Sequence, residues 1–109
     1  MLDKYQGFRY KGSKAFNACF MQRWEIKAIG RVQGVGFRYF VWKLAKEYGI
    51  NGYVRNLSDG SVFIIADSEK HVIDSFCEQL KSGNGRSRID KLIIETMELT
   101  RLYNDFEIR

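Results

Sequence analysis

Proline is absent from this chain of 109 residues, histidine occurs once and cysteine twice. Without proline, the turns must be formed by Gly, Asn, Asp and Ser. These residues favour turns because they adopt left-handed backbone conformations or form side-chain hydrogen bonds to the backbone. Cys19 and Cys77 match no metal-binding or redox spacing. With one histidine and no clustered thiols, the sequence predicts no transition-metal site. His71 is expected on the surface, and Cys77 is expected in the core as a small hydrophobe.

Long apolar runs are also missing. None approaches the length of a membrane span or of a signal-peptide core, so we expect a cytoplasmic protein with no membrane partner. Hydrophobic residues make up 45% of the chain and aromatic residues 15%, which is enough for one folded domain. The net charge is +5, but residues 1–20 alone hold four basic residues against one acidic residue. This uneven distribution weakens any argument that the domain itself binds nucleic acid.

Residues 1–20 are interpreted as an N-terminal extension, and residues 21–109 as the folded domain. The extension mixes aromatic and basic residues without helical or strand periodicity. It could be an arm for single-stranded nucleic acid or for an acidic partner. The favoured interpretation is a dispensable tail, since Met21 could start a complete domain, and its aromatic residues could also fold back onto that domain.

From Met21 onward the apolar residues follow the periods of strands and helices. Alternation over residues 24–32 predicts a half-buried strand, and helical spacing over 37–48 predicts a helix that Gly49 ends. A second helix carries an apolar stripe from Val72 to Leu80 and is expected to be capped by Asp67 or Ser68. Further strands are expected at 50–56, 61–66, within 89–97 and at 106–108, with a hairpin turn at 58–60.

This order of elements, βαββαβ with a short extra strand, predicts an α/β (α+β) fold of the ferredoxin-like sandwich type. Each helix has one apolar face, so both are expected to cover the same side of a single, mostly antiparallel sheet. Strands joined through a crossover helix run parallel. The ends of the first two strands should therefore lie at the same edge of the sheet.

Residues 30–38, GRVQGVGFR, have the composition of an anion site built from backbone. Gly34 and Gly36 allow successive N–H groups to converge, and the helix that follows adds unsatisfied donors and the positive end of its dipole. Arg38 adds a planar guanidinium suited to bidentate phosphate binding. Tyr39 excludes a dinucleotide fingerprint, and no Lys-Ser/Thr pair follows Gly36 as a P-loop requires. No acidic pair near the loop suggests a magnesium site.

Residues 30–38 together with residues 52–62, GYVRNLSDGSV, resemble the two signatures of the acylphosphatase family. Residues 105–109, DFEIR, also resemble the family's usual C-terminus, so the resemblance covers about residues 24–109. It implies a ferredoxin-like sandwich and metal-independent hydrolysis of the carboxyl-phosphate bond of acyl phosphates, without a cofactor. The expected partners are a small-molecule acyl phosphate and inorganic phosphate, as product or inhibitor. The size and fold suit a monomer.

The resemblance also implies roles for single residues. Arg38 would bind the phosphate, and Asn56 would hold and orient the attacking water. Backbone amides would complete the phosphate cradle at Gln33, Gly34, Val35, Gly36, Phe37 and Arg38. Taken singly, Arg38 could be an ordinary exposed helix residue and Asn56 could merely shape a turn. Their joint occurrence in two matching motifs favours catalysis, whereas Arg31, Lys43 and Arg55 are interpreted as peripheral charges.

Two other functions remain open. One is a non-catalytic anion-binding module, because acylphosphatase-like domains also occur within larger carbamoyl-transfer maturation proteins. The other is a small RNA-binding sandwich, which the net charge and the N-terminal extension favour. Recognition of RNA by a sheet requires aromatic residues on its exposed face. Phe37 and Phe40 are expected on the first helix instead, so RNA binding is the least favoured of the three.

Overall fold

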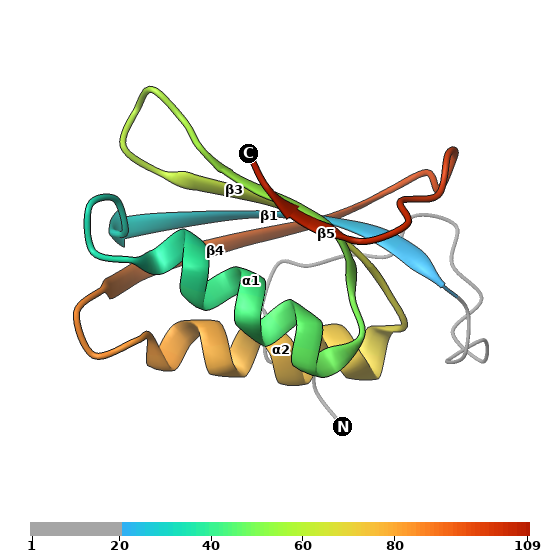
Figure 1. The fold of residues 1–109 in the computed structure, drawn as a ribbon, viewed down its shortest axis with the longest axis horizontal. Helices are drawn as coiled ribbons and strands as arrows, with labels where there is room; N and C mark the ends of the chain where they lie inside the picture. Colours follow the sequence, from blue (N-terminus) through green and yellow to red (C-terminus); the bar gives the residue numbers. More distant parts are fainter. Residues whose placement is uncertain (1–20) are drawn as a thin grey trace.

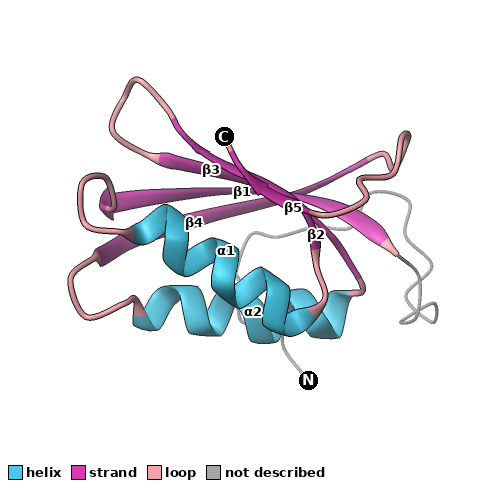
Figure 2. Ribbon diagram, in the orientation of Figure 1, coloured by secondary structure: helices cyan, strands magenta, loops and turns pink. Residues whose placement is uncertain are grey.

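The structure is a computed structural model that describes residues 21–109, so the extension predicted at residues 1–20 lies outside the described residues. Two helices cover one face of a five-stranded sheet and leave the other face open (Figures 1 and 2). In chain order the elements are β1 (Gln22–Arg31), α1 (Phe37–Tyr48), β2 (Asn51–Asn56), β3 (Val62–Ser68), α2 (Lys70–Ser82), β4 (Arg88–Met97) and β5 (Phe106–Ile108).

The strand order in the sheet is β4-β1-β3-β2-β5. β1 pairs antiparallel with β3 and β4, and β2 pairs antiparallel with β3; among the strand pairs within residues 21–109, β2–β5 alone is parallel. The predicted ferredoxin-like sandwich is therefore confirmed, with a mixed sheet that is mostly antiparallel. Val62 of β3 lies opposite both Ala28 of β1 and Asn56 of β2. This register brings the ends of β1 and β2 to the same edge, as the crossover predicted.

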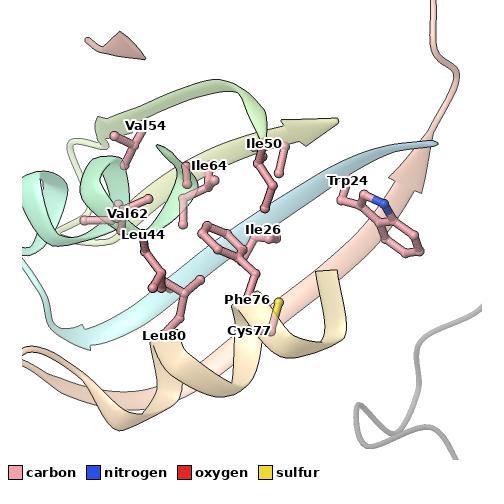
Figure 3. Packing of buried hydrophobic residues seen from close by; sticks show 14 of the residues in the cluster. Trp24, Ile26, Leu44, Ile50, Val54, Val62, Ile64, Phe76, Cys77 and Leu80 are labelled. Atoms are coloured by element: carbon pink, nitrogen blue, oxygen red, sulfur yellow. The ribbon is translucent and has the colours of Figure 1, made fainter. Parts of the chain in front are cut away.

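The hydrophobic core lies between the sheet and the two helices (Figure 3). Ile26 of β1 lies beside Phe76 of α2 in this layer, and the side chains of Trp24, Ile26, Phe76 and Leu80 are all fully buried. Burial of such large apolar side chains stabilises each by about 1.5–3 kcal/mol. Cys77 is buried in the same cluster, as predicted.

The predicted cap of the second helix is wrong. α2 begins at Lys70, its N-cap is Glu69, and no side chain caps it. Asp67 and Ser68 are instead the last two residues of β3, which runs two residues beyond the predicted strand. Asp67 cannot cap the helix because its buried carboxylate accepts two hydrogen bonds from Arg23, one from Nε and one from Nη2, both at 2.7 Å. The Ser68 hydroxyl donates to the carbonyl of Glu69.

The Arg23–Asp67 ion pair also holds the segment that connects β4 to β5. Arg23 Nη2 donates to the carbonyl of Arg101, and the guanidinium lies 4.7 Å from the centre of the Tyr103 ring. The hydrogen bond to Asp67 raises the pKa of Arg23 above its ordinary value, because it stabilises the charged form. The pair thus ties the start of the sheet to the segment that leads into β5.

We expect Asp67→Ala to lower the free energy of unfolding by about 3–5 kcal/mol, because the buried guanidinium of Arg23 would lose its charge partner. Urea denaturation followed by tryptophan fluorescence measures this change. The double variant Arg23→Met/Asp67→Leu removes both charges and should recover most of the loss, since an apolar pair of similar volume is often near neutral. A double variant as unstable as Asp67→Ala would contradict this explanation.

Candidate active site

The loop between β1 and α1 has the backbone that the glycine pattern predicted. Gly34 and Gly36 have φ values of 76° and 78°, both left-handed. A Cβ atom at Gly34 would meet no heavy atom within 4 Å, so the backbone conformation rather than crowding favours glycine there. Gly36 is the N-cap of α1 and supplies no side-chain cap. The first-turn amides of α1 are thereby left without a capping oxygen, which suits an anion.

A cavity of about 250 Å³ lies beside this loop and is lined by residues from three parts of the fold. Arg38 of α1 and Asn56 at the end of β2 both line it, although 18 residues separate them in the sequence. Its full lining consists of Val32, Gly34, Gly36, Phe37, Arg38, Tyr39, Asn56 and Ile108. Of the expected cradle residues, Gln33 and Val35 do not line it. The Val35 side chain is buried in the core instead.

Arg38 is held by the segment that follows β5. Its Nη1 donates to the carbonyl of Arg109 at 3.1 Å, and the Arg109 amide in turn donates to the carbonyl of Val54 in β2 at 2.7 Å. A guanidinium has five N–H donors, so this one contact leaves donors that an anion can use. Ile108, the last residue of β5, reaches the same cavity. The sequence resemblance did not single out this contribution from β5.

The side-chain oxygen Oδ1 of Asn56 is buried and has no hydrogen-bond partner, the sole such side-chain atom found within residues 21–109. Leaving a buried amide oxygen unsatisfied costs about 1–3 kcal/mol. In folded proteins such an atom usually contacts an ordered water or ion or serves catalysis. An O–H donor arriving from the cavity would satisfy Asn56 and remove the cost.

Two side-chain amides hold the β1–α1 loop from opposite sides. Gln33 Nε2 donates to the carbonyls of Leu57 and Ser61, both at 2.8 Å. Asn84 Nδ2 donates to the carbonyl of Val35 at 2.9 Å from the loop between α2 and β4. Figure 1 shows this loop, the β1–α1 loop and the β2–β3 hairpin at one end of the molecule. No local pattern reveals either contact, because each joins segments far apart in the sequence.

Asp59 organises the β2–β3 turn, which forms where it was predicted. Its carboxylate accepts hydrogen bonds from the Ser61 amide at 2.9 Å and from the Ser61 hydroxyl, and Lys27 Nζ lies 3.0 Å away. These contacts lower the pKa of Asp59 well below its ordinary value, chiefly through the Ser61 hydroxyl, then through the Ser61 amide and Lys27. The turn that follows Asn56 is thus held by an ionised aspartate.

NMR titration of the side-chain carboxyl carbon should place the pKa of Asp59 below the value of about 3.9 of an unperturbed aspartate. Because folding lowers this pKa, ionised Asp59 stabilises the fold above the pKa of the unfolded chain. That stability is lost as the pH falls through the folded-state pKa. Ser61→Ala should raise the pKa of Asp59, since it removes the first of these donors.

Ser75→Ala on the exposed side of α2 is the matched control, because its hydroxyl contacts only helix backbone. It should leave the titration of Asp59 unchanged. An unchanged pKa in Ser61→Ala would show that the hydroxyl does not stabilise the carboxylate.

Aromatic residues do occur on the open face of the sheet, which the sequence argument against RNA binding overlooked. Tyr53 and Phe63 lie there with ring centres 6.2 Å apart. The guanidinium of Arg109 lies 4.1 Å from the ring centre of Tyr53, and that of Arg55 lies 5.4 Å from the ring centre of Phe63. These rings are already stacked beneath arginine side chains of the same chain, so they offer poor platforms for bases.

Within the described part of the chain, no three His, Cys, Asp or Glu side chains gather closely enough to hold a metal ion. None of the described helices is long and apolar enough to cross a membrane. His71 is exposed, as predicted, and its Nδ1 lies 3.5 Å from a carboxylate oxygen of Glu69. It lies on α2 and does not line the cavity.

Comparison with known proteins identifies relatives over nearly the whole described chain. A family model described as Acylphosphatase matches residues 24–108. An acylphosphatase from Mannheimia succiniciproducens is 47% identical over 72 residues, which cover 66% of this chain and 80% of that protein. An acylphosphatase from Archaeoglobus fulgidus is 43% identical over 84 residues, covering 77% of this chain and 93% of that protein.

Solved structures agree with the sequence relatives. The crystal structure of acylphosphatase from Bacillus subtilis superposes with a TM-score of 0.77 at 33% identity, covering 83% of this chain and 99% of that one. Full-length HypF in its phosphate- and nucleotide-bound form matches with a TM-score of 0.70 at 31% identity. That match covers 83% of this chain but 12% of HypF. The fold therefore occurs both alone and within a much longer protein.

Proposed function

This chain belongs to the acylphosphatase family, and we propose residue roles on that basis. Arg38 and the loop amides bind the phosphoryl group, and Asn56 orients the attacking water. The activity of the chain is hydrolysis of the carboxyl-phosphate bond of acyl phosphates, which releases a carboxylate and inorganic phosphate. One observation carries the assignment of residues: Arg38 and Asn56, from separate elements, line a single cavity beside the glycine loop.

Phosphoryl transfer depends on positioning and on stabilising the negative charge of the phosphoryl oxygens. The guanidinium of Arg38 can donate two parallel hydrogen bonds to a phosphate. Backbone amides of the glycine loop and the N-terminus of α1 add further donors and a positive dipole end. Because these groups are fixed before the substrate arrives, they stabilise the developing charge without reorganisation.

Asn56 supplies the second half of the site. Its unsatisfied Oδ1 is an acceptor suited to one hydrogen of a water molecule. A water held there can attack phosphorus opposite the departing carboxylate, and a phosphoryl oxygen can take its second proton. A carboxylate leaves readily, so strong general acid catalysis is unnecessary. We therefore propose a metal-independent reaction in which protein donors supply all the charge stabilisation.

The proposed ligands are a small acyl phosphate as substrate and inorganic phosphate as product or inhibitor. The matched structure of full-length HypF is of a phosphate- and nucleotide-bound form, and phosphate is proposed as a ligand of this chain by analogy with that longer protein. A monomeric enzyme is proposed from the size and the fold of the chain. A cytoplasmic location is proposed alongside it and stays a prediction.

Steady-state hydrolysis of benzoyl phosphate in EDTA tests the role of Arg38. Arg38→Ala should lower kcat/KM by at least about 10²–10³-fold, because it removes the main cationic partner of the phosphate. Arg38→Lys should recover little, since an ammonium cannot reproduce the two-pronged contact. Lys43→Ala, a peripheral charge on the same helix, serves as the control and should keep its activity.

Two outcomes would argue against this assignment. Full activity in a folded Arg38→Ala variant would remove Arg38 from the site. A folded wild-type protein that binds phosphate but turns over no substrate would instead support the non-catalytic anion-binding module.

Asn56→Ala should lower kcat by about 10²–10³-fold, as the loss of one preorganised transition-state contact does. The KM for benzoyl phosphate and the inhibition constant of phosphate should change little, because Asn56 contacts the water and not the phosphate. Circular dichroism and thermal melting check that the variant is folded. A wild-type kcat in the folded variant would rule out the proposed role.

A further inference from the structure

The side chain of Gln33 joins the two halves of the site. Its Nε2 carries two N–H donors, and they meet two acceptors, the carbonyls of Leu57 and Ser61. These two residues form the neck of the β2–β3 hairpin, where the Leu57 amide donates to the Ser61 carbonyl at 2.9 Å. Leu57 directly follows Asn56. Gln33 thus contacts the backbone one residue away from the proposed water-orienting side chain.

This contact matters because the two halves of the site lie on different elements. Arg38 belongs to the first turn of α1, whereas Asn56 ends β2, and the rest of α1 lies between them along the chain. In-line attack requires the water to be held accurately at its reactive position relative to the phosphorus. A misplacement of about 1 Å can lower the rate about 10²-fold. A direct side-chain link between the β1–α1 loop and the hairpin neck restricts the distance between the phosphate-binding loop and Asn56.

Asn84 provides an internal contrast. It is also a side-chain amide that donates to a carbonyl at the β1–α1 loop, that of Val35. Its Oδ1 accepts hydrogen bonds from the amides of Arg86 and Ser87, so its other contacts lie in its own turn. Within residues 21–109, no hydrogen bond joins Asn84 to the hairpin neck. The Gln33 side chain therefore connects the β1–α1 loop to the segment that carries Asn56, whereas the Asn84 side chain does not.

We propose that the side chain of Gln33 is a positioning residue that sets the placement of Asn56 relative to the phosphate-binding loop. This role is distinct from the backbone contribution expected of Gln33 in the cradle, and it rests on the proposed roles of Arg38 and Asn56. The side chain acts on kcat through Asn56, whereas Asn84 acts on the loop and on the affinity for phosphate.

Gln33→Leu keeps the backbone amide and removes both side-chain donors. We expect kcat for benzoyl phosphate to fall about ten- to hundredfold. The KM and the inhibition constant of inorganic phosphate should stay within about threefold of wild type, which is less than the worth of one ordinary hydrogen bond. Asn84→Ala should show the opposite pattern, with a phosphate inhibition constant raised about three- to tenfold and a smaller loss of kcat.

A double-mutant cycle tests whether Gln33 acts through Asn56. In the Asn56→Ala background, Gln33→Leu should lower kcat by less than about threefold further, because the group it positions is already missing. An equal loss in both backgrounds would overturn the proposal, as would a wild-type kcat in Gln33→Leu or a phosphate affinity weakened as in Asn84→Ala. A fully active Asn56→Ala variant would instead contradict the proposed function, so the two failures are distinguishable.

Gln33→Glu is the second variant and carries the same test if Gln33→Leu fails to fold. At neutral pH its carboxylate would face two carbonyl oxygens and could donate no hydrogen bond, so kcat should fall. As the pH drops and the carboxyl group is protonated, it regains one donor, and kcat relative to wild type at the same pH should rise. A ratio that does not change with pH would overturn the proposal.

Discussion

The pairing of β3 with both β1 and β2 is the constraint on which the site depends. Because Val62 lies opposite Ala28 on one side and Asn56 on the other, β1 and β2 end at the same edge of the sheet. The loop that follows β1 and the hairpin that follows β2 must then emerge together. Their side chains line one cavity, although neither segment is close to the other in the sequence.

Contacts on the open face of the sheet support this site from a distance. The buried Arg23–Asp67 pair holds the segment that leads into β5, and β5 pairs with β2. The main-chain oxygen of Arg109, the residue after β5, accepts a hydrogen bond from Arg38 Nη1. A buried ion pair is weak evidence for stability by itself, because desolvation offsets much of its attraction. Its value here lies in fixing where the last strand docks.

The fold was predictable because its signals are local. Period-2 and period-3.6 patterns located every element, and the glycine pattern anticipated left-handed backbone at Gly34 and Gly36. The predicted helix cap failed at Asp67. Aspartate favours helix caps, but the carboxylate of Asp67 instead pairs with Arg23, 44 residues away. The argument against RNA binding also overlooked Tyr53 and Phe63 on the open face, and strand alternation alone does not show that arginine side chains cover these rings.

The sequence by itself determined the elements, the glycine loop, and the placement of an arginine in the first turn of α1, because these follow from backbone preferences and short spacings. The family signatures pointed to Arg38 and Asn56 as partners. Only the tertiary structure decided that the side chain of Gln33 links the β1–α1 loop to the neck of the β2–β3 hairpin and that Asn84 holds the loop. Those hydrogen bonds join residues 24 to 49 positions apart, and such pairs meet only when the sheet register and the helix packing bring them together.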